Sequence, residues 1–256
     1  MNAALHNARR VLAIPARRRS TRLPDKMLLC ETGKTVLQHT YEAACRARAP
    51  EAVFIATDDD EIAAVARSFG ADVVMTSPDA PSGTDRIAEA VHSLPRAGVI
   101  VNLQGDEPDA DPEAVDALFD LLDRQPWASM ATVATPLRDL EKLHDPACVK
   151  VVCDSKGRAL YFSRSVTPFP RDGVAEWLSA EPPAFLQHIG MYAYRRPLLM
   201  QMTRWPVGRL EQIEKLEQLR VLENGHAILV AVVNHATRGI DTPEDYAAFV
   251  ARRRAA

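Results

Sequence analysis

The chain is poor in cysteine, because its 256 residues contain only four. They are Cys30, Cys45, Cys148 and Cys153. No two of them form a CxxC pair, and no His and Cys cluster has the spacing of a zinc site. We therefore interpret the four as small buried side chains of a protein from a reducing compartment, and we exclude a disulfide framework.

Long apolar runs are also missing. No stretch approaches the roughly 18 apolar residues of a membrane span, and the first ten residues lack the apolar segment of a secretory signal. These absences predict a cytoplasmic protein that does not act in a membrane. The 31 Lys and Arg against 34 Asp and Glu give a net charge of −3, which argues against nucleic-acid binding. An anionic ligand would need a local basic cluster.

Glycine-rich nucleotide motifs are absent as well. Neither GxxxxGK[ST] nor GxGxxG occurs in the sequence, which excludes a P-loop and a dinucleotide fingerprint. What is present is an ordinary globular composition, with 47% hydrophobic and 25% charged residues. That composition excludes a disordered chain.

Apolar runs of strand length alternate with helical patterns in the first half. The patterns predict strands at 11–16, 52–56, 72–75 and 98–103, and helices at 35–48, 59–69 and 84–94 with Thr84 or Asp85 as the last helix's N-cap. Continuous apolar strands separated by helices are typical of a parallel sheet between layers of helices. The predicted fold class is therefore α/β, with a doubly wound, mostly parallel sheet whose ligands lie beyond the carboxyl ends of the strands.

The second half has a different pattern. It predicts a hairpin at 149–154 and 156–164, a proline-rich loop at 168–183 around one short helix, strands at 188–196 and 227–233, an amphipathic helix at 209–224 and a last helix from 242. Leu210, Ile213, Leu216 and Leu219 should form the inward face of the amphipathic helix. The loop at 168–183 is interpreted as a lid or an interface, and the pattern leaves both open.

Three polar loops follow the predicted strands of the first half. Residues 17–26 carry five cations directly after the first strand, which suits a triphosphate, although a solvated basic loop is the alternative. At residues 81–86 a glycine stands beside hydroxyl residues at a helix start, where an ordinary helix cap is the alternative. In the loop at 104–108, Asp106 is a candidate Mg²⁺ ligand because Gly105 allows close backbone approach; a simple turn is the alternative.

Together these motifs resemble the 3-deoxy-manno-octulosonate (Kdo) cytidylyltransferase family over about Val11 to Phe249. The signatures are IPARRRSTRLPDKML, ATDDDEIA, SGTDRIAE, VNLQGDEP, KVVCD with ALYFSRS, HIGMYAYR, LEQIEKLEQLRVLENG and GIDTPED. The resemblance implies a nucleotide-diphospho-sugar transferase fold with a smaller segment for sugar binding and dimerisation. Residues 1–256 would form one α/β domain, with a tail at 1–10, a CTP-binding half at about 11–150 and a sugar-binding and dimerisation part at about 151–249.

The resemblance also implies a reaction and its residues. CTP and Kdo would give CMP-Kdo and diphosphate for lipopolysaccharide biosynthesis, with Mg²⁺ as cofactor and a homodimer as the assembly. The implied residues are Arg17, Arg22 and Lys26 for the CTP phosphates and catalysis, Ser82, Gly83 and Arg86 for the nucleoside, Asp106 and Asp241 for Mg²⁺ (Asp106 also for catalysis), and Gln104, Arg164, His188, Tyr192 and Glu211 for Kdo. Weaker assignments are Arg171, Glu217, Gln218 and Arg220.

Two alternatives stay open at the level of sequence. The same CTP motifs would serve another acid sugar, such as sialic acid or an amino analogue of Kdo. A non-catalytic nucleotide-binding protein is the other alternative, and it is disfavoured because the basic loop, the carboxylates and the sugar-side residues occur together.

Overall fold

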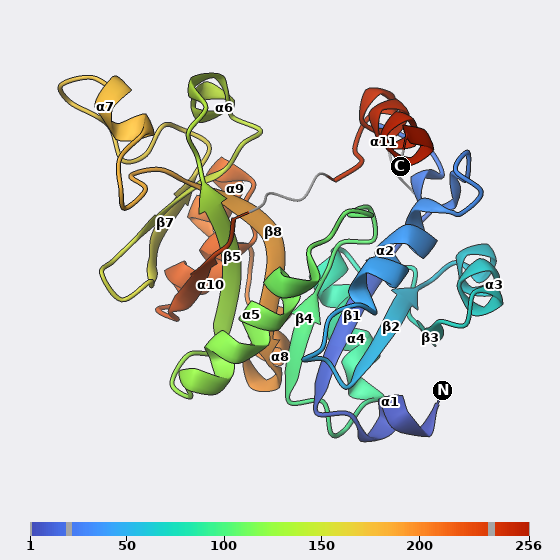
Figure 1. Ribbon diagram of the computed structural model, residues 1–256. Coiled ribbons are helices and arrows are strands. Elements are labelled where there is room, and N and C mark those ends of the chain that lie inside the picture. Colours follow the sequence, from blue (N-terminus) through green and yellow to red (C-terminus); the bar gives the residue numbers. More distant parts are fainter. Residues whose placement is uncertain (1, 19–21, 235–238, 256) are drawn as a thin grey trace. The chain divides into compact units, whose positions relative to one another are not determined.

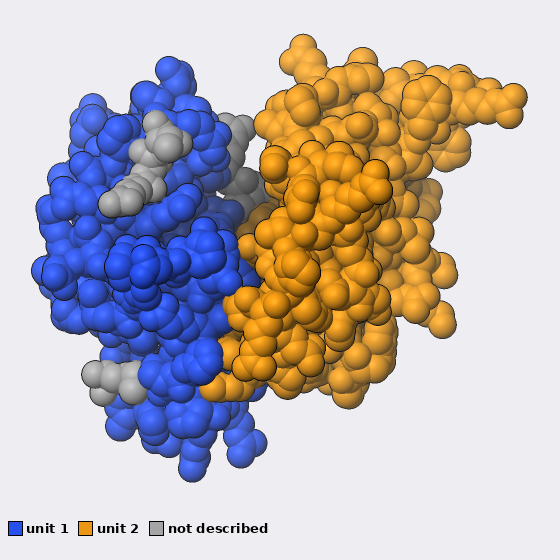
Figure 2. Space-filling model, turned by 180° about the vertical axis from the view of Figure 1, so that it is seen from behind, with its two compact units in different colours: residues 1–119, 237–256 blue, residues 120–236 orange. Residues whose placement is uncertain are grey.

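The computed structural model describes residues 2–18, 22–234 and 239–255. Arg19, Ser20 and Thr21 of the basic loop lie outside the described residues. The chain forms two compact units (Figure 2). Unit 1 comprises residues 1–119 with 237–256, and unit 2 comprises residues 120–236. The boundary therefore falls before residue 150, and the C-terminal segment belongs to unit 1 instead of the sugar-side part.

Unit 1 is built on a parallel sheet in the order β3-β2-β1-β4 (Figure 1). Its strands are β1 (Arg10–Ala16), β2 (Ala52–Thr57), β3 (Asp72–Met75) and β4 (Val99–Asn102). β1 lies between β2 and β4, and Val11 to Ile14 are fully buried. The predicted α/β class and the four predicted strands are confirmed. The parallel pairing brings the loops after β1 and β4 to one edge of the sheet, as expected.

Several helices of unit 1 begin at polar caps. They are α1 (Ala3–Asn7), η1 (Lys26–Leu28), α2 (Val36–Ala44), α3 (Asp60–Ser68), α4 (Gly83–His92), α5 (Pro112–Arg124), which continues into unit 2, and α11 (Pro243–Ala255). Thr35 caps α2 and Asp59 caps α3 through their side-chain oxygens. Ser82 caps α4 by accepting the N–H of Asp85, so the predicted cap at Thr84 or Asp85 is wrong, because the cap lies two or three residues earlier.

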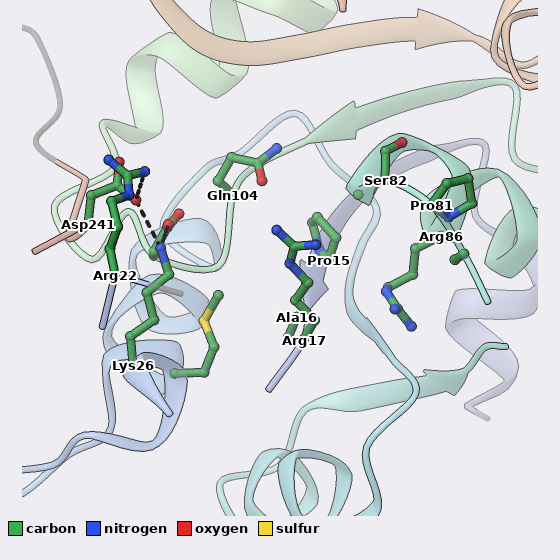
Figure 3. A pocket seen from close by; sticks show the side chains of 14 residues that line it. Pro15, Ala16, Arg17, Arg22, Lys26, Pro81, Ser82, Arg86, Gln104 and Asp241 are labelled. Carbon is green, nitrogen blue, oxygen red and sulfur yellow. Dashed lines mark hydrogen bonds and ion pairs between the residues drawn. The ribbon is translucent and has the colours of Figure 1, made fainter. Parts of the chain in front are cut away.

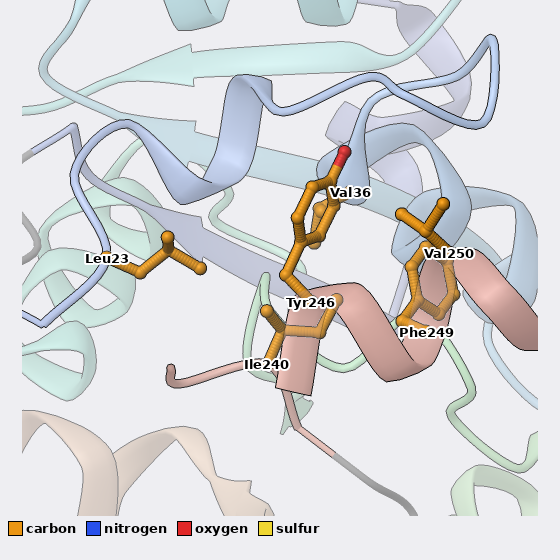
Figure 4. Close-up of a cluster of buried hydrophobic side chains, with 6 residues drawn as sticks. All are labelled: Leu23, Val36, Ile240, Tyr246, Phe249 and Val250. Atoms are coloured by element: carbon orange, nitrogen blue, oxygen red, sulfur yellow. The ribbon is translucent and has the colours of Figure 1, made fainter. Parts of the chain in front are cut away.

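The C-terminal helix α11 returns to the loop that follows β1. Figure 4 shows the contact, in which Tyr246, Phe249 and Val250 of α11 form a buried cluster with Leu23 and Val36. The cluster also contains Ile240. Burying six apolar side chains offsets the entropy of ordering the chain end. It thereby holds Asp241 in unit 1.

Unit 2 is built around the strand β5 (Met130–Pro136). β5 pairs antiparallel with β8 (Leu186–Arg195) and parallel with β9 (Ile228–Val232). The hairpin of β6 (Lys150–Cys153) and β7 (Ala159–Ser163) is as predicted, with Gly157 at φ +75° in its turn. The remaining helices are α6 (Leu140–His144), α7 (Ala175–Leu178), α8 (Arg196–Met202), α9 (Arg209–Glu214) and α10 (Gln218–Glu223).

Four expectations are corrected by the structure. The helix predicted at 209–224 is two helices, because Lys215 has a left-handed backbone (φ 54°) that ends α9. Within α9 the buried residue is Glu211, and Ile213 does not face inward but is 67% exposed. The N-terminal tail contains α1, whose Leu5 is fully buried. All four cysteines are free thiols, but Cys30 and Cys45 are exposed and only Cys148 is buried.

No helix in the described part of the chain is long and apolar enough to cross a membrane. The loop at 168–183 carries α7, as predicted. Val174 and Leu178 of the loop, and Val166 just before it, pack against a cluster that includes Leu143 and Phe185. Whether this loop is a lid or an interface stays a prediction.

Candidate functional site

A cavity of about 360 Å³ lies at the carboxyl ends of β1 and β4 and at the start of α4 (Figure 3). All of its lining residues belong to unit 1. They are Pro15, Ala16, Arg17, Arg22, Lys26, Met27, Ala80, Pro81, Ser82, Gly83, Arg86, Gln104, Asp106 and Asp241. Every residue that the sequence assigned to CTP or Mg²⁺ is in this set. The Kdo candidate Gln104 is there as well.

The basic loop after β1 divides into two groups of cations. Arg17, Arg22 and Lys26 line the cavity. Arg18 instead forms ion pairs with Asp25 and with Glu61 of α3. Asp25 has a left-handed backbone (φ 52°) just before η1. The turn at Asp25 leads directly into Lys26, which is the first residue of η1.

The two predicted metal ligands converge on one ammonium group. Lys26 Nζ is bonded to Asp106 Oδ2 and lies 3.1 Å from Asp241 Oδ1. The backbone supports this convergence, because Ile240 N donates to Asp106 O at 2.8 Å. Arg22 Nη2 is 3.0 Å from the same oxygen of Asp241. Among the described residues, no three His, Cys, Asp or Glu side chains gather as a metal site.

Asp241 is also fixed by the cap of α11. Asp245 Oδ2 accepts hydrogen bonds from Asp241 N (3.1 Å) and Thr242 N (2.9 Å). Burial alone would raise the pKa of Asp245, but the hydrogen bonds from Thr242 and from the Asp241 backbone outweigh it and lower that pKa. Asp245 therefore stays ionised and holds the backbone of Asp241 in place.

Gly105 has a packing role. A Cβ at this position would lie 3.1 Å from Met27 Sδ and from Pro15 O. The Gly105 carbonyl accepts a hydrogen bond from Thr40 Oγ1 of α2 at 2.9 Å. The glycine thus lets the loop that carries Asp106 pack closely on β1 and η1, whereas the sequence interpretation had given this close approach to the ligand.

The nucleoside candidates lie at the start of α4. Ser82 caps the helix, and Gly83 packs on Pro15, since an added Cβ would lie 3.3 Å from Pro15 Cγ. Arg86 is only 4% exposed, and its Nη1 donates to Thr76 Oγ1 (2.6 Å) and lies 3.0 Å from Asp58 Oδ1. The sequence missed Asp58, although it stands in the ATDDDE motif directly after β2. Arg86 therefore braces the loop beyond β3 in addition to lining the cavity.

The sugar candidates His188 and Tyr192 lie together in unit 2. Their ring centroids are 5.5 Å apart, so the two side chains lie on one face of β8. His188 Nε2 is 3.0 Å from Thr132 Oγ1. Tyr192 OH donates to Gln218 Oε1 at 3.1 Å. Gln218 is buried, and its Nε2 is one of two buried side-chain atoms of the described residues with no hydrogen-bond partner. An unpaired buried donor costs stability and marks a position for a ligand acceptor.

Arg164 is held at both its backbone and its side chain. Glu214 accepts hydrogen bonds from Arg164 N (3.0 Å) and Ser163 Oγ (2.8 Å), and Lys150 Nζ donates to Arg164 O at 2.6 Å. The Arg164 guanidinium donates to the carbonyl oxygens of Glu214 (2.7 Å), Pro146 (2.9 Å) and Lys215 (3.4 Å). Three of its five N–H donors are thus used.

Lys150 was not singled out by the sequence. Its side chain is fully buried and donates to three backbone carbonyl oxygens. Burial lowers the pKa of Lys150. The sequence could not predict a buried lysine here, because the carbonyl oxygens around it belong to the backbone of residues 145, 148 and 164.

Glu211 forms a buried ion pair. Both of its carboxylate oxygens accept from Arg220, at 2.7 Å from Nε and 2.6 Å from Nη2. Gly208 N also donates to Glu211 Oε2. This pairing joins α9 to α10. The assignment of Glu211 to the sugar stays a prediction, and Arg164, His188 and Tyr192 lie on other elements of unit 2.

The buried imidazole of His188 gives a pH-dependent prediction. Burial lowers the pKa of His188 to about 3, well below the ordinary value of about 6.5. The unfolded chain therefore binds one more proton than the folded chain below pH 6.5, and stability is lost as the pH falls from 6.5 towards 3. We expect this group alone to remove about 2 kcal/mol between pH 6.5 and 5.

Urea unfolding of the wild type and His188→Gln at the two pH values measures this loss. The variant should lose about 2 kcal/mol less than the wild type. His6→Gln, at an exposed position of α1, is the control and should keep the wild-type pH dependence. An equal loss of unfolding free energy between the two pH values in all three proteins would contradict the prediction.

The chain is similar to known cytidylyltransferases over most of its length. Residues 11–228 match the family model described as cytidylyltransferase. The chain is 50% identical over 243 residues to the 3-deoxy-manno-octulosonate cytidylyltransferase of Rhodopirellula baltica, covering 94% of this chain and 97% of that protein. It is 45% identical to the 8-amino-3,8-dideoxy-manno-octulosonate cytidylyltransferase of Shewanella woodyi, covering 91% and 94% of the two chains.

A solved structure extends the likeness to three dimensions. It is that of CMP:2-keto-3-deoxy-manno-octonic acid synthetase complexed with CTP, which superposes with a TM-score of 0.88 at 39% identity and covers 96% of this chain and 98% of that chain. The likeness includes both units.

Proposed function

Because the chain belongs to the 3-deoxy-manno-octulosonate cytidylyltransferase family, we propose that it transfers CMP from CTP to Kdo, releasing pyrophosphate. One observation carries the proposal. The cavity of unit 1 is lined by three cations and two carboxylates, which are Arg17, Arg22, Lys26, Asp106 and Asp241. Cations that neutralise a triphosphate and carboxylates that take a divalent cation are the two requirements of nucleotidyl transfer.

The residues of the cavity fit Mg²⁺. Mg²⁺ is commonly held in proteins by one or two carboxylates together with substrate phosphates and water. Asp106 and Asp241 supply two carboxylates at one point, since both contact Lys26 Nζ. When bound there, Mg²⁺ would withdraw charge from the phosphate oxygens of CTP. We therefore propose Asp106 and Asp241 as its ligands.

In the proposed reaction the C2 hydroxyl oxygen of Kdo forms a bond to the α-phosphorus of CTP. The bond from the α-phosphorus to the bridging oxygen of pyrophosphate breaks, and the hydroxyl proton leaves to solvent. Arg17 and Arg22 would balance the charge that develops on the departing pyrophosphate. Ser82, Gly83 and Arg86 would bind the nucleoside and thereby place the α-phosphorus.

We assign the acid sugar to candidate residues of unit 2. The two N–H groups of Arg164 that its backbone partners do not use match the two oxygens of a carboxylate. The unpaired Nε2 of Gln218 suits a sugar hydroxyl. His188 is neutral above pH 5, because burial lowers its pKa to about 3. It therefore contributes a hydrogen bond without a charge.

Pyrophosphate release tests the function. The purified chain with CTP and Mg²⁺ should release pyrophosphate with Kdo, and not with sialic acid or without sugar. The 8-amino analogue is a further arm, because relatives with that name are similar to the chain as well. Release with the analogue alone would keep the CTP half of the proposal and replace the sugar. No release with any sugar, from folded protein that binds CTP, would favour a nucleotide-binding protein.

Glu214→Gln tests the sugar side separately. The carboxylate of Glu214 positions Arg164 through its backbone N–H, and the neutral amide should position it less firmly. We expect KM for the acid sugar to rise about tenfold while KM for CTP and kcat stay within about twofold, since the lost interaction supports substrate binding only.

Glu214→Asp should restore part of the sugar affinity, and Glu176→Gln, at an exposed residue of α7, is the control for a lost surface carboxylate. An equal rise in both KM values, or an unchanged sugar KM, would remove Glu214 from the positioning of Arg164.

Assembly and location complete the proposal. We propose a homodimer, and exposed apolar side chains of unit 2 support it: Leu160 is 60% and Phe169 is 81% exposed. We also propose action in the cytoplasm, where CTP is made, with the product used in lipopolysaccharide biosynthesis. Sedimentation of the purified chain tests the dimer.

A further inference from the structure

Lys26 has no hydrogen-bonding capacity left. An ammonium group has three N–H donors, and Lys26 Nζ has three acceptors: Asp106 Oδ2, Asp241 Oδ1 at 3.1 Å and the carbonyl oxygen of Ile240 at 3.1 Å. The side chain is 11% exposed. A phosphate can therefore take a hydrogen bond from Lys26 only after the ammonium leaves one of these acceptors.

The same ammonium stands between the two carboxylates that are proposed to bind the metal. Asp106 and Asp241 are brought together by the backbone bond from Ile240 N to Asp106 O, so their convergence does not depend on Lys26 alone. The positive charge of Lys26 lies where a cation held by both carboxylates would experience strong repulsion. Lys26 and a divalent cation cannot both hold the two carboxylates.

We propose that Lys26 is a built-in counter-ion of this site, which a divalent cation displaces and which then turns to the nucleotide phosphates. The proposal rests on the proposed function, because it takes Asp106 and Asp241 as the metal ligands. Its consequence is coupling. The metal binds weakly to the protein without nucleotide, and metal and triphosphate each favour the binding of the other, because one ammonium group serves both.

The chain is suited to this exchange. Lys26 reaches the carboxylates with a flexible four-carbon stem, so its ammonium can move without a change of the backbone. Arg22 contacts Asp241 and is 65% exposed, so it shields only one of the two carboxylates. Arg17 lines the same cavity and, within the described residues, is not bonded to either carboxylate. A variant of Arg17 therefore changes the charge of the cavity without removing a group that occupies the site between the two carboxylates.

Mn²⁺ binding to the full chain without nucleotide tests the proposal. The probe is Mn²⁺ alone, and the free ion is measured by its electron paramagnetic resonance signal. Lys26→Met should bind Mn²⁺ at least about tenfold more tightly than the wild type, because the competing ammonium is gone. Lys26→Arg keeps the charge and should keep weak binding. Arg17→Met, which removes a charge from the same cavity, should tighten binding by less than about threefold.

Two controls make the outcome specific. Asp106→Asn in the Lys26→Met background should abolish the gain, which locates the ion at these carboxylates. A cooperative melting transition by circular dichroism confirms that each variant is folded. Unchanged Mn²⁺ affinity in Lys26→Met, an equal gain in Arg17→Met, or a gain that survives Asp106→Asn would each overturn the proposal. The pyrophosphate assay of the wild type with Kdo reports on the proposed function independently.

Discussion

Asp106→Asn is expected to lower the rate of pyrophosphate release by roughly 10³-fold, because it removes the charge of a carboxylate that would hold Mg²⁺ beside the triphosphate. The asparagine has almost the shape of the aspartate, and the backbone carbonyl at this position still accepts the hydrogen bond from Ile240 N. The change therefore removes a negative charge and leaves the loop in place. The loss should appear at saturating CTP and acid sugar.

Asp109→Asn is the matched control for this measurement. Asp109 is three residues further along the same segment, and its carboxylate pairs with Arg252 and Arg253 of α11 at 2.8 Å each. Its replacement should leave the rate within about threefold, because an exposed ion pair contributes little. Both variants should still unfold in one cooperative transition, which shows that they are folded. A near-normal rate of Asp106→Asn at moderate Mg²⁺ would reject Asp106 as a metal ligand.

The sequence predicts the cavity of unit 1 because its geometry follows from chain-local rules. Apolar runs such as VLAI and VIV form parallel strands, and the loops that follow parallel strands meet at one edge of the sheet. Arg17 and Asp106 are therefore brought together by the fold class alone. Asp241 is different, since it arrives through the packing of α11 on Leu23 and Val36, and only the resemblance indicated it.

The break at Lys215 could not be predicted from periodicity. Leu210, Ile213 and Leu216 fit one helical face, and nothing in the sequence of Lys215 announces a left-handed backbone, which is uncommon outside glycine and asparagine. Within α9 itself the buried side chain is Glu211, which pairs with Arg220, and Ile213 is exposed. The predicted inward face therefore fails inside α9 as well as at the break, because an ion pair fills the place that an apolar side chain was expected to fill.

The partners of charged side chains in unit 2 were equally out of reach. The resemblance implies Glu211 and Arg164 as candidates, but it cannot say whether a carboxylate faces a ligand or an arginine nine residues away. The structure gives Glu211 a partner in Arg220 and gives Arg164 its backbone acceptors. How far Glu211 and Arg164 contribute to sugar binding therefore depends on the hydrogen-bonding groups that these partners do not occupy.

The buried pair of Glu211 and Arg220 yields the largest expected effect on stability. Both side chains are about nine-tenths buried, and both hydrogen bonds are shorter than 2.8 Å. Removing one partner leaves an unpaired buried charge, which costs about 3–5 kcal/mol. We expect Arg220→Met and Glu211→Leu each to lower the free energy of unfolding by that amount. Urea unfolding at pH 7 gives the measurement.

The double variant separates the pair from its surroundings. Since no buried charge is left alone, Glu211→Leu with Arg220→Met should lose less than the sum of the two single changes, and the difference is the coupling energy. Additive losses would mean that the pair does not act as a unit.

Kinetics of the milder Glu211→Gln then decide the role of Glu211 in sugar binding. Both carboxylate oxygens of Glu211 are held by Arg220, so we expect Glu211 to act on the acid sugar only indirectly, through the position of α9. The KM for the acid sugar should therefore change only slightly. A large rise in that KM in a variant of near-normal stability would show that Glu211 contacts the sugar itself.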